Sequence, residues 1–455
     1  MGTLCSLLHR WLRGPLSGQR IGRIRRYPGI RRFGAAAAAL ALVASVASCG
    51  VWAESSAGSQ GQAGGSGPAP AASAGSSAPG STPGTAPGTA VPTSTSTPTP
   101  TPTPGKGPAC AAVRCTSVLM TGDMLVHAQL WDQGRADALA TGAKGLDFAP
   151  LLAGQRRYIE KSDLAICHQE TPVATPAGPF SAYPSFNVPP QIAAAVRQTG
   201  YQACTTASNH TIDRGTAGLV RTLDALDAAG LQHTGSYRSA ADAQGVMILQ
   251  TAAAKVAVIE GTYGLNGQVP EAAWQVDMLD PGAMIAKARK ARSLGADIVL
   301  GAMHAGDEYA SVPNAEQQRV AHALADSGQF TMVYGHHTHS VLPIERYKGT
   351  WIVYGLGNGI TELSPSYVVN NEGLLVRAQF SQDAAGTWTA SDLAWAPSVI
   401  VRGPYRWCSV AADAPQGLCA GAAADAATRL RTKTVVEAMG AAAAGAHELL
   451  ITKER

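Results

Sequence analysis

The sequence predicts a layered α/β domain in which helices cover a sheet that is at least partly parallel. Three observations predict it: short apolar runs alternate with helical patterns from Cys110 onward, polar residues follow several of those runs, and glycines follow the helical stretches. The residues before Cys110 show no such alternation. The chain of 455 residues therefore divides into a leader, a stalk and one large folded part, residues 110–455.

The leader, residues 1–48, is predicted to be a signal segment. Eight arginines and no acidic residue precede Ala35–Val46, an apolar run shorter than the roughly 20 residues of a bilayer span. Val46-Ala47-Ser48-Cys49 resembles the bacterial lipobox, whose cysteine is lipidated, and cleavage without lipidation is the alternative. We therefore expect an extracytoplasmic protein, on the cell surface or the periplasmic side, anchored to the membrane through Cys49.

The stalk, residues 49–109, is predicted to be disordered, because Ala, Gly, Ser, Thr and Pro dominate it and Thr97–Pro104 is a run of Thr-Pro pairs. The formal net charge of the chain is +4, and it becomes −4 once the eight leader arginines are set aside. Since the basic charge belongs to the leader, the folded part is not expected to bind nucleic acid.

The folded part begins with a predicted strand and continues with helices and strands in turn. Apolar and β-branched runs of the length expected in a buried sheet predict these strands: Ser117–Met120, Leu164–Cys167, Gln202–Thr205, Val246–Gln250, Val256–Glu260, Ile298–Met303, Phe330–Tyr334, Trp351–Tyr354 and Leu374–Phe380. Prolines at the start or glycines after the end predict these helices: Pro189–Thr199, Thr216–Ala229, Pro281–Leu294 and Ala315–Asp326. The Ala-rich residues 422–455 suggest a helix, with disorder as the alternative.

Six cysteines lie in residues 110–455, consistent with an exported protein. The close pairs Cys110/Cys115 and Cys408/Cys419 lie outside the predicted strands, and we expect each to form a local disulfide. Cys167 and Cys204 lie at or near strand ends, and either a disulfide or two free thiols fits the sequence.

Metal-binding side chains follow five of the predicted strands, which is where α/β folds place their sites. The segments are Thr121–Asp123, His168–Glu170, Ala207–His210, His304 and Gly335–His339. Carboxylate, amide and imidazole ligands suit one or two divalent ions such as Mn, Fe or Zn, and the lack of cysteine among them argues against a closed structural zinc site.

His210 is the candidate proton donor. Asp213 follows it by three residues and is placed to turn back and hold the imidazole ring. The alternative role for Asp213 is to cap the helix that begins near Thr216.

An ordered set of motifs in this region resembles the CapA family of poly-γ-glutamate capsule synthesis proteins, in the calcineurin-like metallophosphoesterase superfamily. The motifs are Gly122-Asp123, Glu170-Thr171-Pro172, Asn209-His210-x-x-Asp213-x-Gly215, His304-x-Gly306-x-Glu308-Tyr309, Gly335-His336-His337-x-His339 and Leu356-Gly357-Asn358. The resemblance covers about residues 116–365 and implies a four-layer α/β/β/α sandwich with a metal centre at one end, followed by a C-terminal extension.

The resemblance also implies roles for individual residues. It implies a catalytic role for His210 with Asp213, and a substrate-lining role for Glu308 and Tyr309, beside Tyr263. The metal ligands that it implies are Asp123, Glu170, Asn209, His304, His337 and His339.

The sequence departs from the superfamily pattern at two positions and leaves a third open. Leu125 stands where the Asp-x-His motif has its histidine, and His127 is two residues too far along to replace it. Glu170 stands where the superfamily has a bridging aspartate, and His336 has no assigned role. These differences leave the choice between a one-metal and a two-metal site open.

Three functions fit this pattern. The first is a CapA-like role in the synthesis, export or retention of an anionic capsule polymer, within a capsule synthesis complex; Arg402 and Arg406 are then candidate contacts for its carboxylates. The second is a metal-dependent hydrolase of phosphoesters outside the membrane. The third is a surface scaffold without enzymatic activity.

Overall fold

The computed structural model describes residues 105–112, 114–364, 366–415 and 417–453. The predicted leader, Cys49 and most of the predicted stalk lie outside these residues. Lys106, near the end of the predicted stalk, donates its backbone N–H to Asp163 at 3.0 Å. In the described part of the chain, no helix is long and apolar enough to cross a membrane.

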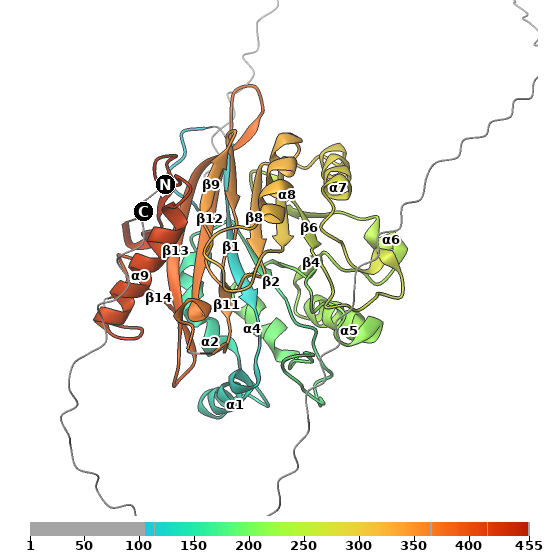
Figure 1. Cartoon of the computed structure of the whole chain (residues 1–455), viewed down its shortest axis with the longest axis vertical. Coiled ribbons are helices and arrows are strands. Elements are labelled where there is room, and N and C mark those ends of the chain that lie inside the picture. Colours follow the sequence, from blue (N-terminus) through green and yellow to red (C-terminus); the bar gives the residue numbers. More distant parts are fainter. Residues whose placement is uncertain (1–104, 113, 365, 416, 454–455) are drawn as a thin grey trace, which may run out of the picture. The chain divides into compact units, whose positions relative to one another are not determined.

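Two sheets form the centre of the domain (Figure 1). The first runs in the order β14 (Arg406–Ser409), β13 (Trp388–Val401), β12 (Glu372–Gln382), β1 (Arg114–Met124), β2 (Leu164–His168), β3 (Ala203–Thr205) and β4 (Gln232–Thr234), with β11 (Asn358–Ile360) beside β1 and β15 (His447–Glu448) beside β13. The second runs in the order β5 (Met247–Gln250), β6 (Lys255–Thr262), β7 (Ile298–His304), β8 (Met332–His336), β10 (Thr350–Val353) and β9 (Ile344–Tyr347).

Both sheets are mixed. Strands β1 to β4 are parallel to one another, and so are β6, β7, β8 and β10. Antiparallel strands flank these parallel blocks: β12, β13 and β14 extend the first sheet, and β5 and β9 close the second. The parallel blocks bring several strand ends to the same edge of the domain.

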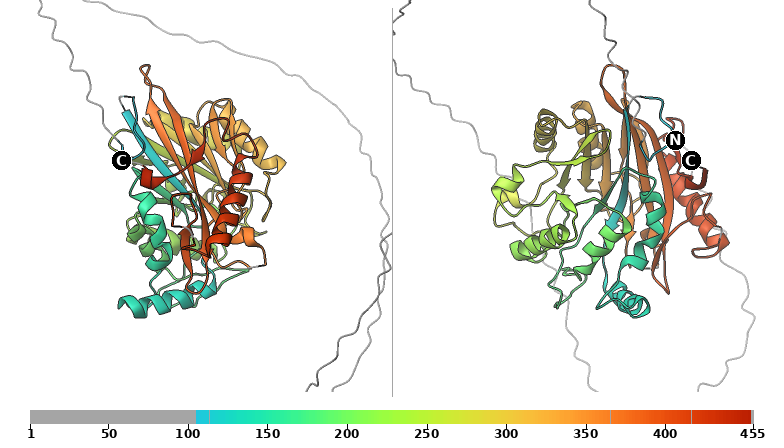
Figure 2. Two further views of the ribbon diagram at one scale, coloured as in Figure 1. Left: turned by 90° about the vertical axis from the view of Figure 1, so that its left-hand side faces the viewer. Right: turned by 180° about the vertical axis from the view of Figure 1, so that it is seen from behind.

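Helices cover the outer face of each sheet (Figures 1 and 2). Those on the first sheet are α1 (Ala128–Thr141), α2 (Ala149–Leu152), α3 (Arg156–Ile159), α4 (Gln191–Thr199) and α5 (Gly215–Ala228). On the second lie α7 (Pro281–Ser293) and α8 (Ala315–Asp326), with the short α6 (Ala240–Ala243) before β5. Helix α9 (Ala422–Glu437) packs against β12 and β13. Four 3-10 turns complete the described elements: Ala153–Gln155, Ala273–Gln275, Val368–Asn371 and Ile451–Lys453.

Three apolar cores separate these layers, and strand alternation assigns residues to them. Along β1, Val118 and Met120 point into the core between the sheets, whereas Leu119 points into the core under the helices of the first sheet. Along β6, Val258 faces the space between the sheets and Ile259 faces α7 and α8. The predicted four-layer α/β/β/α sandwich is therefore confirmed.

The structure contains all nine predicted strands and all four predicted internal helices, with ends that shift by a few residues. The Ala-rich C-terminal segment is helical over α9 and then turns and forms β15, so neither one continuous helix nor disorder describes it. Both expected local disulfides form, and Cys167 pairs with Cys204, with 4.4 Å between their Cα atoms.

Candidate metal centre

The carboxyl ends of parallel strands from both sheets meet at one edge and carry the candidate ligands. In the first sheet, His168 at the end of β2 lies beside Asp123 of β1. In the second sheet, His304 at the end of β7 lies beside His336 at the end of β8. The fold thus brings Asp123 and His336, which are 213 positions apart in the sequence, into direct contact.

Two small glycines allow the strands to approach at this edge. A Cβ atom on Gly122 would lie 2.1 Å from the backbone oxygen of Gly357, and one on Gly335 would lie 2.2 Å from that of Tyr354. Each glycine stands immediately before a residue of the cluster, Asp123 or His336. After β8 the backbone turns through left-handed conformations at His337 (φ 85°) and His339 (φ 50°), which costs energy for residues with a side chain.

Five side chains form two overlapping groups that have the spacing of metal ligands. Asp123, His168 and His304 form one group, and Asp123, Glu170 and His339 form the other. Within each group the ligand atoms lie within 4.8 Å of one another, and every residue is buried. Asp123 belongs to both groups, so its carboxylate is placed to serve two neighbouring positions.

Many polar atoms of this cluster have no hydrogen-bond partner. They are both carboxylate oxygens of Glu170, Nε2 of His168 and His336, and Nδ1 of His304 and His337. Buried polar atoms are normally satisfied, and leaving one without a partner costs about 1–3 kcal/mol. Because these atoms are the donor types that divalent cations bind, the cluster fits one or two such ions.

Asp123 is the best-connected member of the cluster. Its Oδ1 lies 2.8 Å from Nδ1 of His336, and its Oδ2 accepts the backbone N–H of His337 at 3.0 Å. Burial alone would raise the pKa of its carboxyl group, but the hydrogen bonds from His336 and His339 hold that pKa well below its usual value. Asp123 is therefore ionised at neutral pH and ready to bind a cation.

The second carboxylate behaves differently. Burial raises the pKa of Glu170 to about 7, opposed by His339 and reinforced by Asp123. Burial lowers the pKa of His337 to about 3, and His339 contributes to that shift. Burial also lowers the pKa of His304 well below its usual value, with help from His337. His304 and His337 are thus neutral imidazoles, which is the form that binds metal.

Asn209 reaches the cluster through His304. Its Oδ1 lies 2.8 Å from Nε2 of His304, and its side-chain amide donates to Asn266 at 3.2 Å. In this arrangement Asn209 orients His304 by a direct hydrogen bond. Its predicted role as a metal ligand stays a prediction.

The predicted acid pair has the expected geometry. Nδ1 of His210 lies 2.8 Å from Oδ2 of Asp213, and that oxygen also accepts the backbone N–H of Phe186 at 2.8 Å. Asp213 does not cap α5: the capping position is Arg214, and no side chain makes a capping bond there. The alternative role considered for Asp213 is therefore wrong.

Exposed aromatic side chains stand over the histidines. The ring of Tyr263 lies 4.5 Å from that of His337, and the ring of Tyr309 lies 6.2 Å from that of His339. Both tyrosines are 42% exposed, and Glu308 beside Tyr309 is exposed as well. These residues have the accessibility that their predicted substrate-lining role requires.

The two predicted arginine contacts are already occupied. Arg402 pairs with Glu362 at 2.6 Å, and Arg406 pairs with Asp137 at 2.7 Å. Both acids are buried or nearly so, and each holds its guanidinium within the fold. Contact of these arginines with polymer carboxylates stays a prediction.

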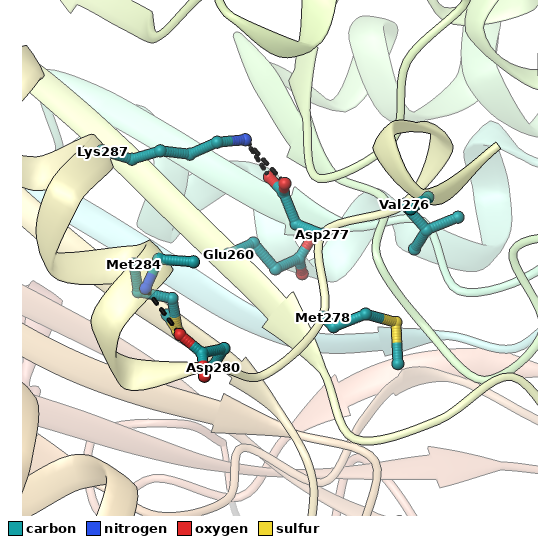
Figure 3. A pocket seen from close by; sticks show the side chains of 9 residues that line it. Glu260, Val276, Asp277, Met278, Asp280, Met284 and Lys287 are labelled. Atoms are coloured by element: carbon teal, nitrogen blue, oxygen red, sulfur yellow. Dashed lines mark hydrogen bonds and ion pairs between the residues drawn. The ribbon is translucent and has the colours of Figure 1, made fainter. Parts of the chain in front are cut away.

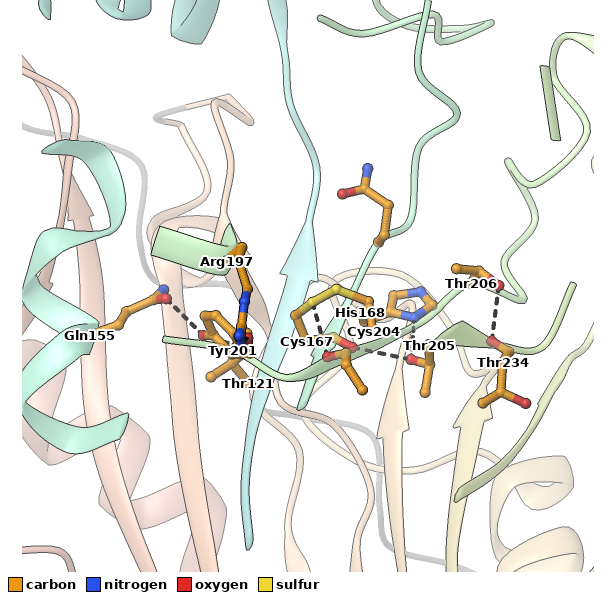
Figure 4. The surroundings of a disulfide bond; sticks show 12 residues. Thr121, Gln155, Cys167, His168, Arg197, Tyr201, Cys204, Thr205, Thr206 and Thr234 are labelled. Atoms are coloured by element: carbon orange, nitrogen blue, oxygen red, sulfur yellow. Dashed lines mark hydrogen bonds between the residues drawn. A yellow bond between two sulfur atoms is a disulfide. The ribbon is translucent and has the colours of Figure 1, made fainter. Parts of the chain in front are cut away.

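His168, Glu260 and Asn266 take part in the site, and the sequence interpretation assigned none of them a role. His168 lies in a candidate loop, and its ring stacks on that of His336 at 4.2 Å (Figure 4 shows His168 beside Thr205). Glu260 could have been found from the sequence, because a carboxylate within the largely apolar strand β6 (Lys255–Thr262) needs a partner when it is buried. Nothing in the sequence pointed to Asn266.

His127 lies two residues after Leu125, which occupies the position of the motif histidine. It belongs to neither of the two ligand groups.

Comparison with known proteins identifies the family. The sequence profile described as "Bacterial capsule synthesis protein PGA_cap" matches residues 117–362, more than half of the chain. The chain belongs to this family. The match spans all the candidate metal ligands and ends before β12.

Curated relatives of the PGA_cap chain carry capsule-related names. It is 27% identical over 204 residues to "PGA biosynthesis protein CapA" of Bacillus subtilis, covering 44% of this chain and 52% of that protein. It is 28% identical to "Capsule biosynthesis protein CapA" of Bacillus anthracis, and the match covers 36% of this chain and 41% of that protein. A "Probable polyglutamine synthesis accessory protein" of Mycobacterium tuberculosis is 29% identical to this chain, and the match covers 35% of this chain and 45% of that protein. The chain spans about half the length of the curated relatives it matches.

Solved structures overlap this PGA_cap chain only partly. A "calcineurin-like phosphoesterase YfkN" of Bacillus subtilis is 16% identical, with a TM-score of 0.42 over 72% of this chain and 99% of that one. A "Putative 5'-Nucleotidase" of Staphylococcus aureus is also 16% identical, with a TM-score of 0.41 over 62% of this chain and 54% of that one. The family assignment rests on the sequence profile.

Proposed function

We propose that this PGA_cap protein acts outside the cytoplasmic membrane on an anionic capsule polymer, such as poly-γ-glutamate, through a divalent-metal site. One observation carries the proposal: a buried cluster of carboxylates and imidazoles, with unsatisfied ligand atoms, lies inside the segment that matches a capsule synthesis family. The polymer is negatively charged and the chain beyond its leader has a formal net charge of −4. A bound cation would therefore supply the local attraction that the protein itself lacks.

The chemistry proposed is hydrolysis. A bound divalent ion would polarise the scissile group and activate water. On the side of the first sheet, Asp123, His168 and Glu170 would hold the ion. On the side of the second sheet, His304 and His339 would hold it. His210 would donate a proton from Nε2 to the leaving group, because Asp213 accepts the hydrogen on Nδ1 and stabilises the charged ring. Glu308 and Tyr309 would contact the substrate at the exposed mouth.

Hydrolysis of phosphoesters is the second candidate. The same arrangement supports it, in which a cluster with two carboxylates lies near His210 and Asp213. Hydrolysis of a phosphoester is helped by a cation that offsets the negative charge of the phosphate and by a proton donor for the leaving oxygen. A scaffold without activity is the third outcome. The substrate distinguishes these functions, and the fold does not.

One experiment tests the three functions. The purified full chain is stripped of metal, reloaded separately with Mn²⁺, Zn²⁺ and Fe²⁺, and assayed on poly-γ-glutamate, a phosphodiester and a phosphomonoester. Asp123→Ala and His210→Gln are compared with His322→Gln, which alters a histidine that pairs with Glu345 outside the cluster. Polymer shortening that only the first two variants abolish supports the main proposal. Turnover of phosphoesters alone supports the second function, and a protein that binds metal but turns over none of the three substrates supports the scaffold.

We also propose that the chain is an exported lipoprotein anchored through Cys49. The Arg-rich start, the apolar run and the lipobox-like residues support this, and so do the three disulfides, which form in oxidising compartments. Cys49→Ala should abolish incorporation of labelled fatty acid and release the protein from the membrane fraction. Wild-type protein that takes up no label, or that stays inside spheroplasts, would exclude the anchor.

A further inference from the structure

Glu260 is a buried carboxylate behind the metal centre. It lies in β6, and strand alternation places it with Val256 and Val258 on the side facing the first sheet. Its Oε2 accepts two backbone N–H groups, from Thr206 at 2.8 Å and from Ala207 at 2.6 Å. Together with Asp277 and Lys287 it lines a cavity of about 230 Å³. Figure 3 shows how these side chains lie.

The other oxygen of Glu260 faces His168. Oε1 lies 3.1 Å from Nδ1 of the imidazole, at ion-pair distance but without hydrogen-bond geometry. The Thr205 hydroxyl lies 2.9 Å from the same nitrogen and is its hydrogen-bond partner (Figure 4). Nε2 on the opposite side of the ring has no hydrogen-bond partner. His168 is one of the three residues in the group formed with Asp123 and His304. The imidazole therefore lies between a carboxylate and a candidate cation position.

The ionised carboxylate accepts hydrogen bonds and donates none. A neutral imidazole carries one hydrogen, and a partner that only accepts requires that hydrogen on the nitrogen facing it. The negative charge 3.1 Å from Nδ1 therefore favours the hydrogen on that nitrogen, where the Thr205 hydroxyl can accept it, and this leaves the lone pair on Nε2. A metal-binding histidine commonly gives its second nitrogen to a carboxylate in this way, and loss of such a partner weakens metal binding about 10- to 100-fold.

We infer that Glu260 is a positioning residue that fixes the Nδ1–H tautomer of His168 and so presents Nε2 to a metal ion. The inference rests on the proposed metal-dependent function and adds a named partner for one ligand. Glu260 acts through His168 and does not itself belong to either ligand group. It also links β6 to the loop after β3 and to the last residue of β2, which its two oxygens contact.

The substitution Glu260→Gln tests the tautomer with little change in shape. The two backbone N–H groups of Thr206 and Ala207 need an acceptor, so the single amide oxygen of glutamine must occupy the Oε2 position. The amide NH₂ then faces Nδ1 of His168 and donates to it. The ring hydrogen moves to Nε2, and that nitrogen loses the lone pair needed for binding metal.

Two measurements on the full chain follow. Burial lowers the pKa of His168, but Glu260 and the other nearby carboxylates raise it above its usual value, so the metal-free protein with ¹⁵N-labelled histidine is measured at a pH high enough to keep the ring neutral. The His168 resonance, assigned with His168→Gln, should then show the Nδ1–H tautomer in the wild type and the Nε2–H tautomer in Glu260→Gln. In titrations with Mn²⁺ and with Zn²⁺, Glu260→Gln should bind about 10- to 100-fold more weakly than the wild type. Asp277→Asn is the matched control, because Asp277 lines the same cavity but pairs with Lys287, and it should match the wild type in both measurements.

The outcomes separate this inference from the proposed function. A wild type that binds neither ion overturns the proposed metal function, and the tautomer measurement in metal-free protein still tests Glu260. A Glu260→Gln protein with unchanged tautomer and unchanged affinity overturns the inference alone. Equal weakening in Glu260→Gln and Asp277→Asn, in folded proteins with the same circular dichroism, also overturns it, because the effect would then belong to the cavity as a whole.

Discussion

His337 is a single residue whose surroundings oppose its charge. It is almost fully buried, and burial together with the neighbouring His339 lowers its pKa from 6.5 to about 3. In the unfolded chain the same imidazole takes up a proton near pH 6.5. The unfolded state therefore binds more protons between pH 6.5 and 3, so this residue contributes stability above pH 6.5 that is lost as the pH falls.

The prediction concerns the metal-free protein. Lowering the pH from 8 to 5 should cost wild type about 2 kcal/mol more free energy of unfolding than it costs His337→Gln, since a pKa unit corresponds to 1.36 kcal/mol. Glu170, whose pKa is raised to about 7, acts in the opposite direction in both proteins and cancels in this difference. Urea unfolding at the two pH values measures it. The control His322→Gln should follow the wild type, and equal losses in wild type and His337→Gln would contradict the prediction.

Asp213 gives a second prediction at the residue scale. Its carboxylate holds Nδ1 of His210 and compensates the charge of the ring. If His210 is the acid of the proposed hydrolysis, Asp213→Asn should lower kcat at least ~100-fold and leave KM nearly unchanged, because the loss is confined to proton transfer. Steady-state kinetics on the substrate that the wild type turns over measure both constants. A change confined to KM would assign the pair to substrate binding.

The sequence predicted the ligand-bearing loops well and the contacts between them poorly. Asp123, Glu170 and His304 each follow a recognisable apolar strand, so local pattern was enough to find them. Glu260 and Asn266 reach the site only because two sheets pack face to face, and their partners lie 54 and 57 residues away. The pairing of Arg402 and Arg406 with acids of the fold escaped prediction for the same reason, because those acids are 40 and 269 residues away.

At the scale of elements, the strands that escaped prediction are those without a simple apolar pattern. β13 runs over Trp388–Val401 and includes Ala, Ser and Pro397, yet most of its residues are buried against β12 and α9. The helix α1 buries polar Asp137 and leaves Leu139 exposed, and Gly134 inside it lies where a Cβ would come within 2.9 Å of Phe148. Tertiary packing determines both elements, and local propensity does not reveal them.

The disulfide between β2 and β3 is an element-scale prediction. Cys167 and Cys204 are directly paired neighbours in the sheet, and His168 and Thr205 are the next pair along it. Cys167→Ala/Cys204→Ala should lower the free energy of unfolding by about 3–4 kcal/mol, from the entropy of the closed loop of 37 residues. It should also weaken Mn²⁺ binding, because His168 follows Cys167 directly. Urea unfolding and metal titration measure the two effects.

The matched control is Cys408→Ala/Cys419→Ala, which removes a disulfide of sequence separation 11 away from the cluster. It should lower stability by less and leave the metal affinity unchanged. Loss of metal affinity in both double variants would show that the effect follows stability in general and not the position of His168.

At the scale of the whole molecule, the candidate metal centre joins the two sheets. Asp123, His168 and Glu170 come from the first sheet, and His304 and His339 come from the second. An ion held by both groups would bind the folded state and not the unfolded chain, and such binding stabilises a protein in proportion to the logarithm of ligand concentration over Kd. Away from this edge the interface between the sheets is largely apolar, so the ion adds a specific contact at one edge.

Removal of metal should therefore destabilise the entire domain and not only the site. At a metal concentration 100 times Kd, the wild type should gain about 2.7 kcal/mol of unfolding free energy over the chelator-treated protein. His304→Gln removes a ligand contributed by the second sheet, so its gain should be much smaller, whereas His322→Gln should keep the wild-type gain because its partner Glu345 lies outside the cluster. Calorimetric unfolding with and without metal measures each gain. If wild type and His304→Gln gained equally, the ion would be bound elsewhere; if neither gained, the cluster would stabilise the sheets without a cation.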